Sequence, residues 1–108
     1  NLTAAETEYR QVLVQEPDNA KAMRGIGFCR IRQADYAGAA QSYGDASRAE
    51  PGNADSWSGL GSACLGLQKL DEAEAAFAKA QAIDPRNIML VKGTELLNQA
   101  KAAGKENQ

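Results

Sequence analysis

Few side chains in the sequence could take part in catalysis. The chain contains no histidine, which removes the commonest general base and the usual partner of a serine or cysteine nucleophile. Cys29 and Cys64 form no CxxC pair and lie in apolar stretches, where free cysteine behaves as a small hydrophobic residue. Asp71 and Glu72 fall at an expected helix start, where carboxylates offset the positive end of the helix dipole. We therefore expect that the chain is not an enzyme and that both thiols are buried and unpaired.

Two glycine-rich stretches resemble parts of a phosphate-binding loop. GIG at 25–27 and GLG at 59–61 have suitable residue types, but they fall inside expected helices and follow no strand. No acidic or cysteine residues have the spacing of a metal site. The sequence therefore predicts neither a cofactor nor a metal.

Charge and hydropathy argue against two kinds of partner. The net charge is −2, and the 24% of charged residues mix both signs along the chain, unlike a nucleic-acid or basic membrane-binding surface. No apolar run approaches the ~18 residues of a membrane span. We therefore expect no nucleic-acid partner and no membrane insertion, and both the cytoplasm and a bacterial periplasm fit the sequence.

The strongest pattern is an internal repeat. The three prolines stand at 17, 51 and 85, an interval of 34, each within an acidic–Pro–x–Asn tetrad. Four further columns hold asparagine, glycine, alanine and an aromatic residue at the same interval: Asn19, Asn53 and Asn87; Gly25, Gly59 and Gly93; Ala5, Ala39 and Ala73; Tyr9, Tyr43 and Phe77. A fixed period across several columns predicts stacked repeats that bury their apolar faces against one another.

The tetrad marks the boundary between one repeat and the next. Proline ends the preceding helix, and the asparagine two residues later caps the following one. A second break near Ala34 and Gln68 divides each repeat into two helices. Thr3 and Glu6 have the spacing of a capping box for the first helix. The expected helices cover 2–15, 20–33, 36–49, 54–67, 70–83 and 88–103.

These units resemble the tetratricopeptide repeat, whose motif is large-x-x-Leu-Gly-x-x-Tyr, then Ala-x-x-x-Phe-x-x-Ala, then Pro. The matching residues are Met23, Ile26, Gly27, Ala39, Tyr43, Ala46 and Pro51 in one unit, and Trp57, Leu60, Gly61, Ala73, Phe77, Ala80 and Pro85 in the next. The resemblance implies an all-α fold: a right-handed superhelical stack of about two and a half helix–turn–helix repeats with a C-terminal capping helix. We expect a single domain over 1–103, composed of a half repeat at 1–19, repeats at 20–53 and 54–87, and the capping helix at 88–103, with a frayed tail at 104–108.

The sequence departs from the motif at two columns. The tyrosine expected eleven residues into each unit is Arg30 or Cys64, and the glycine often found between the two helices is Ala34 or Gln68.

The first expected helix has no pairing helix before it in the sequence. Its apolar residues Leu2, Ala5, Tyr9 and Val12 would then be uncovered, although terminal repeats normally present a polar outer face. We interpret the chain as a fragment of a longer array, with self-association through this face as the alternative.

In this family the first helices of successive units line a concave groove that holds a peptide or a partner's helix. The resemblance implies that the partner-binding residues here are Lys21, Arg24, Phe28, Ile31, Arg32, Asp55, Ser58, Ser62, Leu65, Lys92 and Leu96. Their mixture of basic and apolar side chains favours an amphipathic helix or extended segment with some acidic residues. The column of Gly25, Gly59 and Gly93 would serve either helix packing or close approach of a partner's backbone, and the sequence leaves both open.

The carboxylate clamp, which holds acidic C-termini of heat-shock chaperones in some family members, is not expected. Phe28 and Ser62 stand where the clamp has asparagine, and Gly25, Gly59 and Gly93 stand where it has longer side chains.

The expected function is that of a non-enzymatic protein–protein interaction module, a scaffold or adaptor that binds a partner's peptide or helix. The alternative is an oligomerisation or spacer element that self-associates through the uncovered N-terminal helix, for example in a bacterial pilus or secretion assembly. A regulatory domain of a larger enzyme also fits the sequence.

Overall fold

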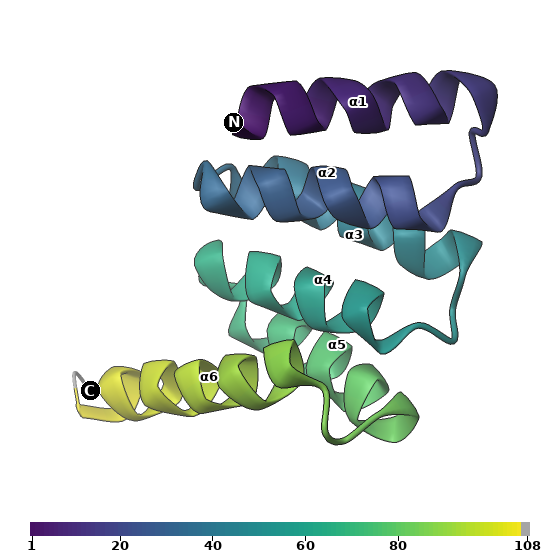
Figure 1. Cartoon of the computed structure of the whole chain (residues 1–108). Helices are drawn as coiled ribbons and strands as arrows, with labels where there is room; N and C mark the ends of the chain where they lie inside the picture. The colour runs from purple at the N-terminus through teal and green to yellow at the C-terminus, as the bar shows by residue number, and fades with distance from the viewer. Residues whose placement is uncertain (107–108) are drawn as a thin grey trace.

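The computed structural model describes residues 1–106, which form six helices and no strand (Figure 1). The helices are α1 (Leu2–Gln15), α2 (Ala20–Arg32), α3 (Tyr36–Ala49), α4 (Ala54–Gly66), α5 (Leu70–Ile83) and α6 (Ile88–Glu106). The predicted all-α class is confirmed. Helices α1, α3 and α5 have the predicted bounds, α2 and α4 end one residue early, and α6 continues three residues beyond 103. Residues 107 and 108 lie outside the described part, so fraying of the tail stays a prediction.

Asparagine side chains begin four of the helices. Asn19 Oδ1 accepts a hydrogen bond from the Ala22 N–H, and Asn1, Asn53 and Asn87 make equivalent bonds. The predicted capping box at α1 is wrong, because Asn1 caps this helix and Thr3 lies inside it. Glu6 is consequently free to bind Arg30 of α2.

Within each repeat, a left-handed residue joins the two helices. Ala34 has φ 59° and Gln68 has φ 63°. At the end of α2 the Ala34 N–H bonds to the Ile31 carbonyl and the Asp35 N–H to the Arg30 carbonyl. Gln68 and Lys69 repeat these bonds at the end of α4. This pair of backbone hydrogen bonds is a Schellman motif, which usually has glycine at the left-handed position.

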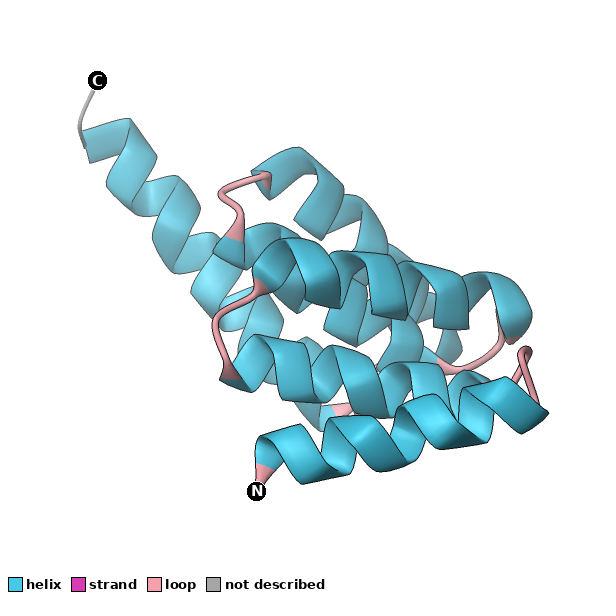
Figure 2. Cartoon of the chain, turned by 90° about the horizontal axis from the view of Figure 1, so that it is seen from above, coloured by secondary structure: helices cyan, strands magenta, loops and turns pink. Residues whose placement is uncertain are grey.

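The helices stack so that α2, α4 and α6 form one layer and α3 and α5 lie behind it (Figure 1). We call α2, α4 and α6 first helices, and α1, α3 and α5 second helices, after their places in the repeat. Each helix contacts only its neighbours in the stack, and α1 contacts α2 alone among the described helices. The molecule is accordingly elongated, 49 × 27 × 18 Å, and the C-terminal end of α6 extends beyond the other helices (Figure 2).

Aromatic rings held between pairs of glycines form the centre of the stack. A Cβ atom added at Gly27 of α2 or at Gly59 of α4 would lie within 3.0 Å of the Tyr43 ring. Phe77 is held in the same way between Gly61 of α4 and Gly93 of α6. Burial raises the pKa of Tyr43 to about 12. The glycine column therefore serves helix packing, the first of the two roles left open by the sequence.

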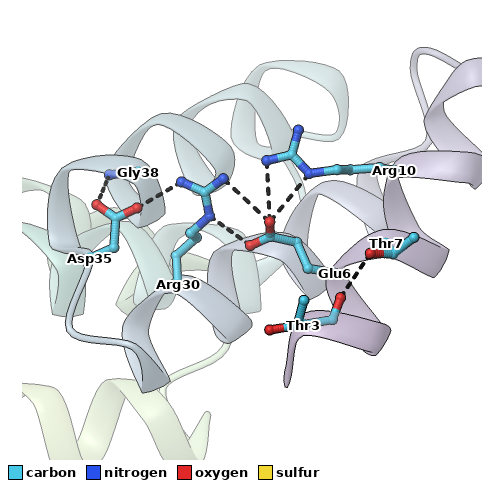
Figure 3. Close-up of polar contacts among 7 residues, drawn as sticks. All are labelled: Thr3, Glu6, Thr7, Arg10, Arg30, Asp35 and Gly38. Atoms are coloured by element: carbon cyan, nitrogen blue, oxygen red, sulfur yellow. Dashed lines mark hydrogen bonds and ion pairs between the residues drawn. The ribbon is translucent and has the colours of Figure 1, made fainter. Parts of the chain in front are cut away.

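A charged cluster joins α1 to the first complete repeat (Figure 3). The Arg30 guanidinium lies 2.6 Å from a Glu6 carboxylate oxygen and 2.7 Å from an oxygen of Asp35. Arg30 lowers the pKa of Glu6, while the Gly38 N–H and Arg30 together lower the pKa of Asp35. Arg10 also contacts Glu6, at 3.2 Å. Arg30, which replaces the tyrosine of the motif, thus connects α1, α2 and the start of α3 by charge.

Candidate peptide-binding cleft

An open cleft of about 480 Å³ lies between the first helices α4 and α6, near the turn that joins α2 to α3. Side chains of four helices line it: Ile31 of α2, Tyr36 of α3, Ser62, Leu65 and Gly66 of α4, and Met89, Lys92, Gly93, Leu96 and Ala100 of α6, with Gln68 from the turn after α4. The volume of the cleft is in the range of known ligand sites.

The lining combines an apolar surface with one charge. Ile31, Leu65, Met89 and Leu96 supply aliphatic side chains, and Leu96 is 48% exposed. Lys92 is exposed and is the one charged side chain of the lining. An apolar side chain of a ligand would be desolvated in this cleft. The Lys92 ammonium group could at the same time pair with a carboxylate of the ligand.

Five of the eleven predicted binding residues converge on this cleft. They come from three first helices: Ile31, Ser62, Leu65, Lys92 and Leu96. They meet because residues 34 apart occupy the same register position on successive stacked helices.

The other six predicted residues lie elsewhere. Arg24 is only 18% exposed and bonds to Glu50 at 3.2 Å, which ties α2 to the end of α3. Ser58 is fully buried, and its hydroxyl has no hydrogen-bond partner. Asp55 accepts a hydrogen bond from the Asn87 amide. These three side chains are engaged by the fold and are not free to form a continuous binding surface.

Three exposed residues of α2 also lie outside the cleft. Phe28 is 50% exposed, and the Arg32 guanidinium lies 5.9 Å from its ring centroid. Lys21 is exposed in the first turn of α2. The basic side chains among the predicted binding residues are thus divided, with Lys92 in the cleft and the α2 cations outside it.

Six lining residues lie outside the eleven predicted binding residues: Tyr36, Gly66, Gln68, Met89, Gly93 and Ala100. Tyr36 begins a second helix, and the prediction considered first helices only. A Cβ atom added at Gly66 would lie within 3.0 Å of the Tyr36 ring. The sequence signal that could have found this contact is the glycine at the end of α4 together with the aromatic residue that follows the turn between α2 and α3.

Both cysteines are free and buried, as predicted, and burial raises the pKa of each thiol, which disfavours the nucleophilic thiolate. Within residues 1–106, no group of three or more histidine, cysteine or acidic residues could hold a metal ion. None of the described helices is long and apolar enough to cross a membrane.

Known structures share this fold along nearly the whole chain. The first tetratricopeptide domain of human RPAP3 superposes with a TM-score of 0.89 at 20% identity, covering 99% of this chain and 84% of that one. The first tetratricopeptide domain of Spaghetti (RPAP3), solved with the HSP90 peptide SRMEEVD bound, gives 0.86 at 22% identity, covering 94% and 80%. The domain of Arabidopsis OM64 gives 0.84 at 19% identity, covering 91% and 81%.

A family model described as tetratricopeptide repeat matches residues 29–88, from the end of α2 to the start of α6. This match spans more than half of the chain and includes the Gly59–Tyr43 and Gly61–Phe77 contacts and both left-handed turns. The chain therefore belongs to the tetratricopeptide repeat family.

Proposed function

We propose that the chain is a protein-interaction module, a scaffold or adaptor that holds a short segment of a partner protein in the cleft between α4 and α6. The observation that carries the proposal is the convergence of aliphatic side chains from three stacked helices, three of them half-buried and Leu96 exposed, around one exposed ammonium group. A concave, mostly apolar surface with a few polar groups is the usual form of a binding site.

The cleft indicates what kind of segment fits. Leu65, Met89 and Leu96 form walls for one or two apolar side chains, and Lys92 can pair with a single carboxylate. A segment with an apolar anchor and one nearby acidic residue matches this lining better than a strongly acidic one. The peptide SRMEEVD, bound by the Spaghetti domain, carries three acidic side chains, whereas this cleft offers one cation. We expect SRMEEVD to bind this chain more weakly than a peptide with an apolar anchor.

The test begins with selection of peptides from a displayed random library on the immobilised chain. The recovered consensus is synthesised and titrated by calorimetry, with an expected Kd in the micromolar range, about −8 kcal/mol. Leu96→Glu places a charge in the apolar wall and should weaken binding at least about tenfold.

A matched control lies on the same helix. Val91 is 56% exposed but does not line the cleft, so Val91→Glu should leave the Kd unchanged. Lys92→Glu should weaken the binding of peptides with an acidic residue more than the binding of analogues in which that residue is replaced by its amide. Equal Kd values for the wild type and Leu96→Glu would contradict the assignment of the cleft.

A further inference from the structure

Four side chains with polar groups interrupt the apolar lining of the cleft between α4 and α6. Lys92 is charged, whereas Tyr36, Ser62 and Gln68 carry neutral groups. Among the hydrogen bonds of residues 1–106, none uses the side chain of these three neutral residues. Each hydroxyl can donate and accept, and the glutamine amide carries two N–H donors and a carbonyl acceptor. The cleft therefore offers neutral hydrogen-bonding groups that the fold does not use.

These neutral groups match an extended ligand segment better than a helical one. A helix satisfies most of its own main-chain N–H and C=O groups, so an apolar wall and a few charges are enough to hold it. An extended segment that lies against aliphatic side chains takes its main-chain groups out of water, and each group left unpaired costs free energy. Neutral polar side chains beside an apolar wall supply the missing partners.

The length of the cleft suits a short extended segment. Its α6 wall runs from Met89 to Ala100, and at about 1.5 Å per residue this distance is about 16 Å. An extended chain covers it with about five residues. Gln68 is exposed at the edge where the turn after α4 meets the cleft. Its amide can accept a hydrogen bond from one main-chain N–H while it donates to a neighbouring C=O.

We propose that the segment held in the cleft is extended and that the Gln68 amide binds its main chain. This inference rests on the proposed function of the cleft, and it adds the conformation of the segment and a binding residue outside the first helices. The aliphatic walls and Lys92 take side chains of the segment, while Gln68 pairs with one of its main-chain amides. Because this contact does not depend on the side chains of the segment, Gln68 adds affinity for any sequence that supplies the apolar anchor.

The turn after α2 provides a matched control. Ala34 and Gln68 have left-handed φ values of 59° and 63° and donate equivalent main-chain hydrogen bonds, but Ala34 does not line the cleft. Glycine adopts this φ without steric cost, so Ala34→Gly and Gln68→Gly should both raise the Tm. Calorimetry with the peptide selected from the displayed library should give a Kd weakened about three- to tenfold by Gln68→Gly and unchanged by Ala34→Gly. A variant that is more stable and yet binds less tightly excludes partial unfolding as the cause.

A second pair of measurements identifies the main-chain contact itself. Gln68→Ala gives the turn after α4 the residue of the turn after α2, and it should weaken binding as much as Gln68→Gly. The selected peptide is also made as a series with one N-methylated amide in each member. Methylation at the paired amide should weaken binding to the wild type about three- to tenfold but should not weaken binding to Gln68→Ala further. Nuclear Overhauser contacts within the bound, isotope-labelled peptide should be those of an extended chain.

Three results would overturn the inference: equal Kd values for the wild type and Gln68→Ala, N-methyl effects that are the same in both proteins at every position, and helical contacts in the bound peptide. Leu96→Glu shows which proposal has failed. If Leu96→Glu weakens binding and Gln68→Ala does not, the cleft remains the binding site and this inference alone is wrong. If Leu96→Glu binds as tightly as the wild type, or if the library yields no peptide, the proposed function fails and this inference fails with it.

Discussion

Substitution of Gly59 by alanine is predicted to destabilise the fold, although alanine is the better helix former. The added Cβ would lie less than 3.0 Å from the Tyr43 ring, whereas carbon atoms prefer separations of about 3.5–4.0 Å. Tyr43 is 2% exposed, and Gly27 closes the opposite side of its ring, so the ring has no space into which it can move.

The expected magnitude follows from two opposing effects. Alanine gains about 1 kcal/mol over glycine in a helix interior. Overpacking a dense core costs about 1–3 kcal/mol, and a ring held on both sides belongs at the upper end of that range. The net result is a loss of about 2 kcal/mol in the free energy of unfolding, or a fall in Tm of roughly 8–16 °C for a domain of this size.

Gly44→Ala is the matched control. Gly44 also lies inside a helix, α3, but a Cβ there would meet only the Arg48 side chain, at 3.6 Å. This variant should be unchanged or more stable by up to about 1 kcal/mol. Urea denaturation of both variants measures the difference, and a Gly59→Ala chain as stable as Gly44→Ala would refute the packing role of the glycine column.

Three further predictions concern turns, buried polarity and charge. Gln68→Gly should stabilise the chain by about 1 kcal/mol in thermal unfolding, because glycine adopts the left-handed φ of this turn without steric cost; a lower Tm would contradict it. Ser58→Ala should raise stability by about 1 kcal/mol, since it removes a buried hydroxyl that has no hydrogen-bond partner, and denaturant unfolding that shows a loss would reveal an unrecognised partner. Glu6→Gln should cost about 1 kcal/mol at pH 7. The depressed pKa of Glu6 makes its ionised form stabilising above the unfolded value of about 4, and this contribution disappears as the pH falls through the folded pKa. Unfolding curves of wild type and Glu6→Gln should therefore converge as the pH falls below the folded pKa of Glu6, and a constant difference at all pH values would exclude the linkage.

Most of the fold could be predicted from the sequence, because its determinants are local and repeated. Prolines end helices and asparagines begin them, so Pro51 and Asn53 place a boundary regardless of the rest of the chain. The capping box at Thr3 failed because Asn1, two residues earlier, offers a competing cap. The end of α6 was placed too early, at 103, because Gly104 follows and glycine often ends a helix, whereas α6 continues through Gly104 to Glu106.

The site was harder to predict. The position of a residue within the repeat determines which face of the helix it occupies, but not which neighbouring residues cover that face. Arg24, Ser58 and Lys92 share one register position, yet Arg24 bonds to Glu50, Ser58 is buried and only Lys92 is free. These outcomes depend on the neighbouring helix at each point of the stack. The same reasoning explains why Phe28 and Leu96, although equivalent, lie on two different surfaces.

We propose above that the cleft between α4 and α6 receives the partner segment. The most direct test of this proposal is an NMR titration of the methyl-labelled chain with the peptide selected from the displayed library. A peptide held in the cleft should shift the methyl signals of Ile31, Leu65, Met89 and Leu96 together, with saturation at one Kd, while those of Val14 and Ile88 stay unchanged. Saturable shifts confined to Val14 or Ile88, with the four cleft residues unaffected, would contradict it.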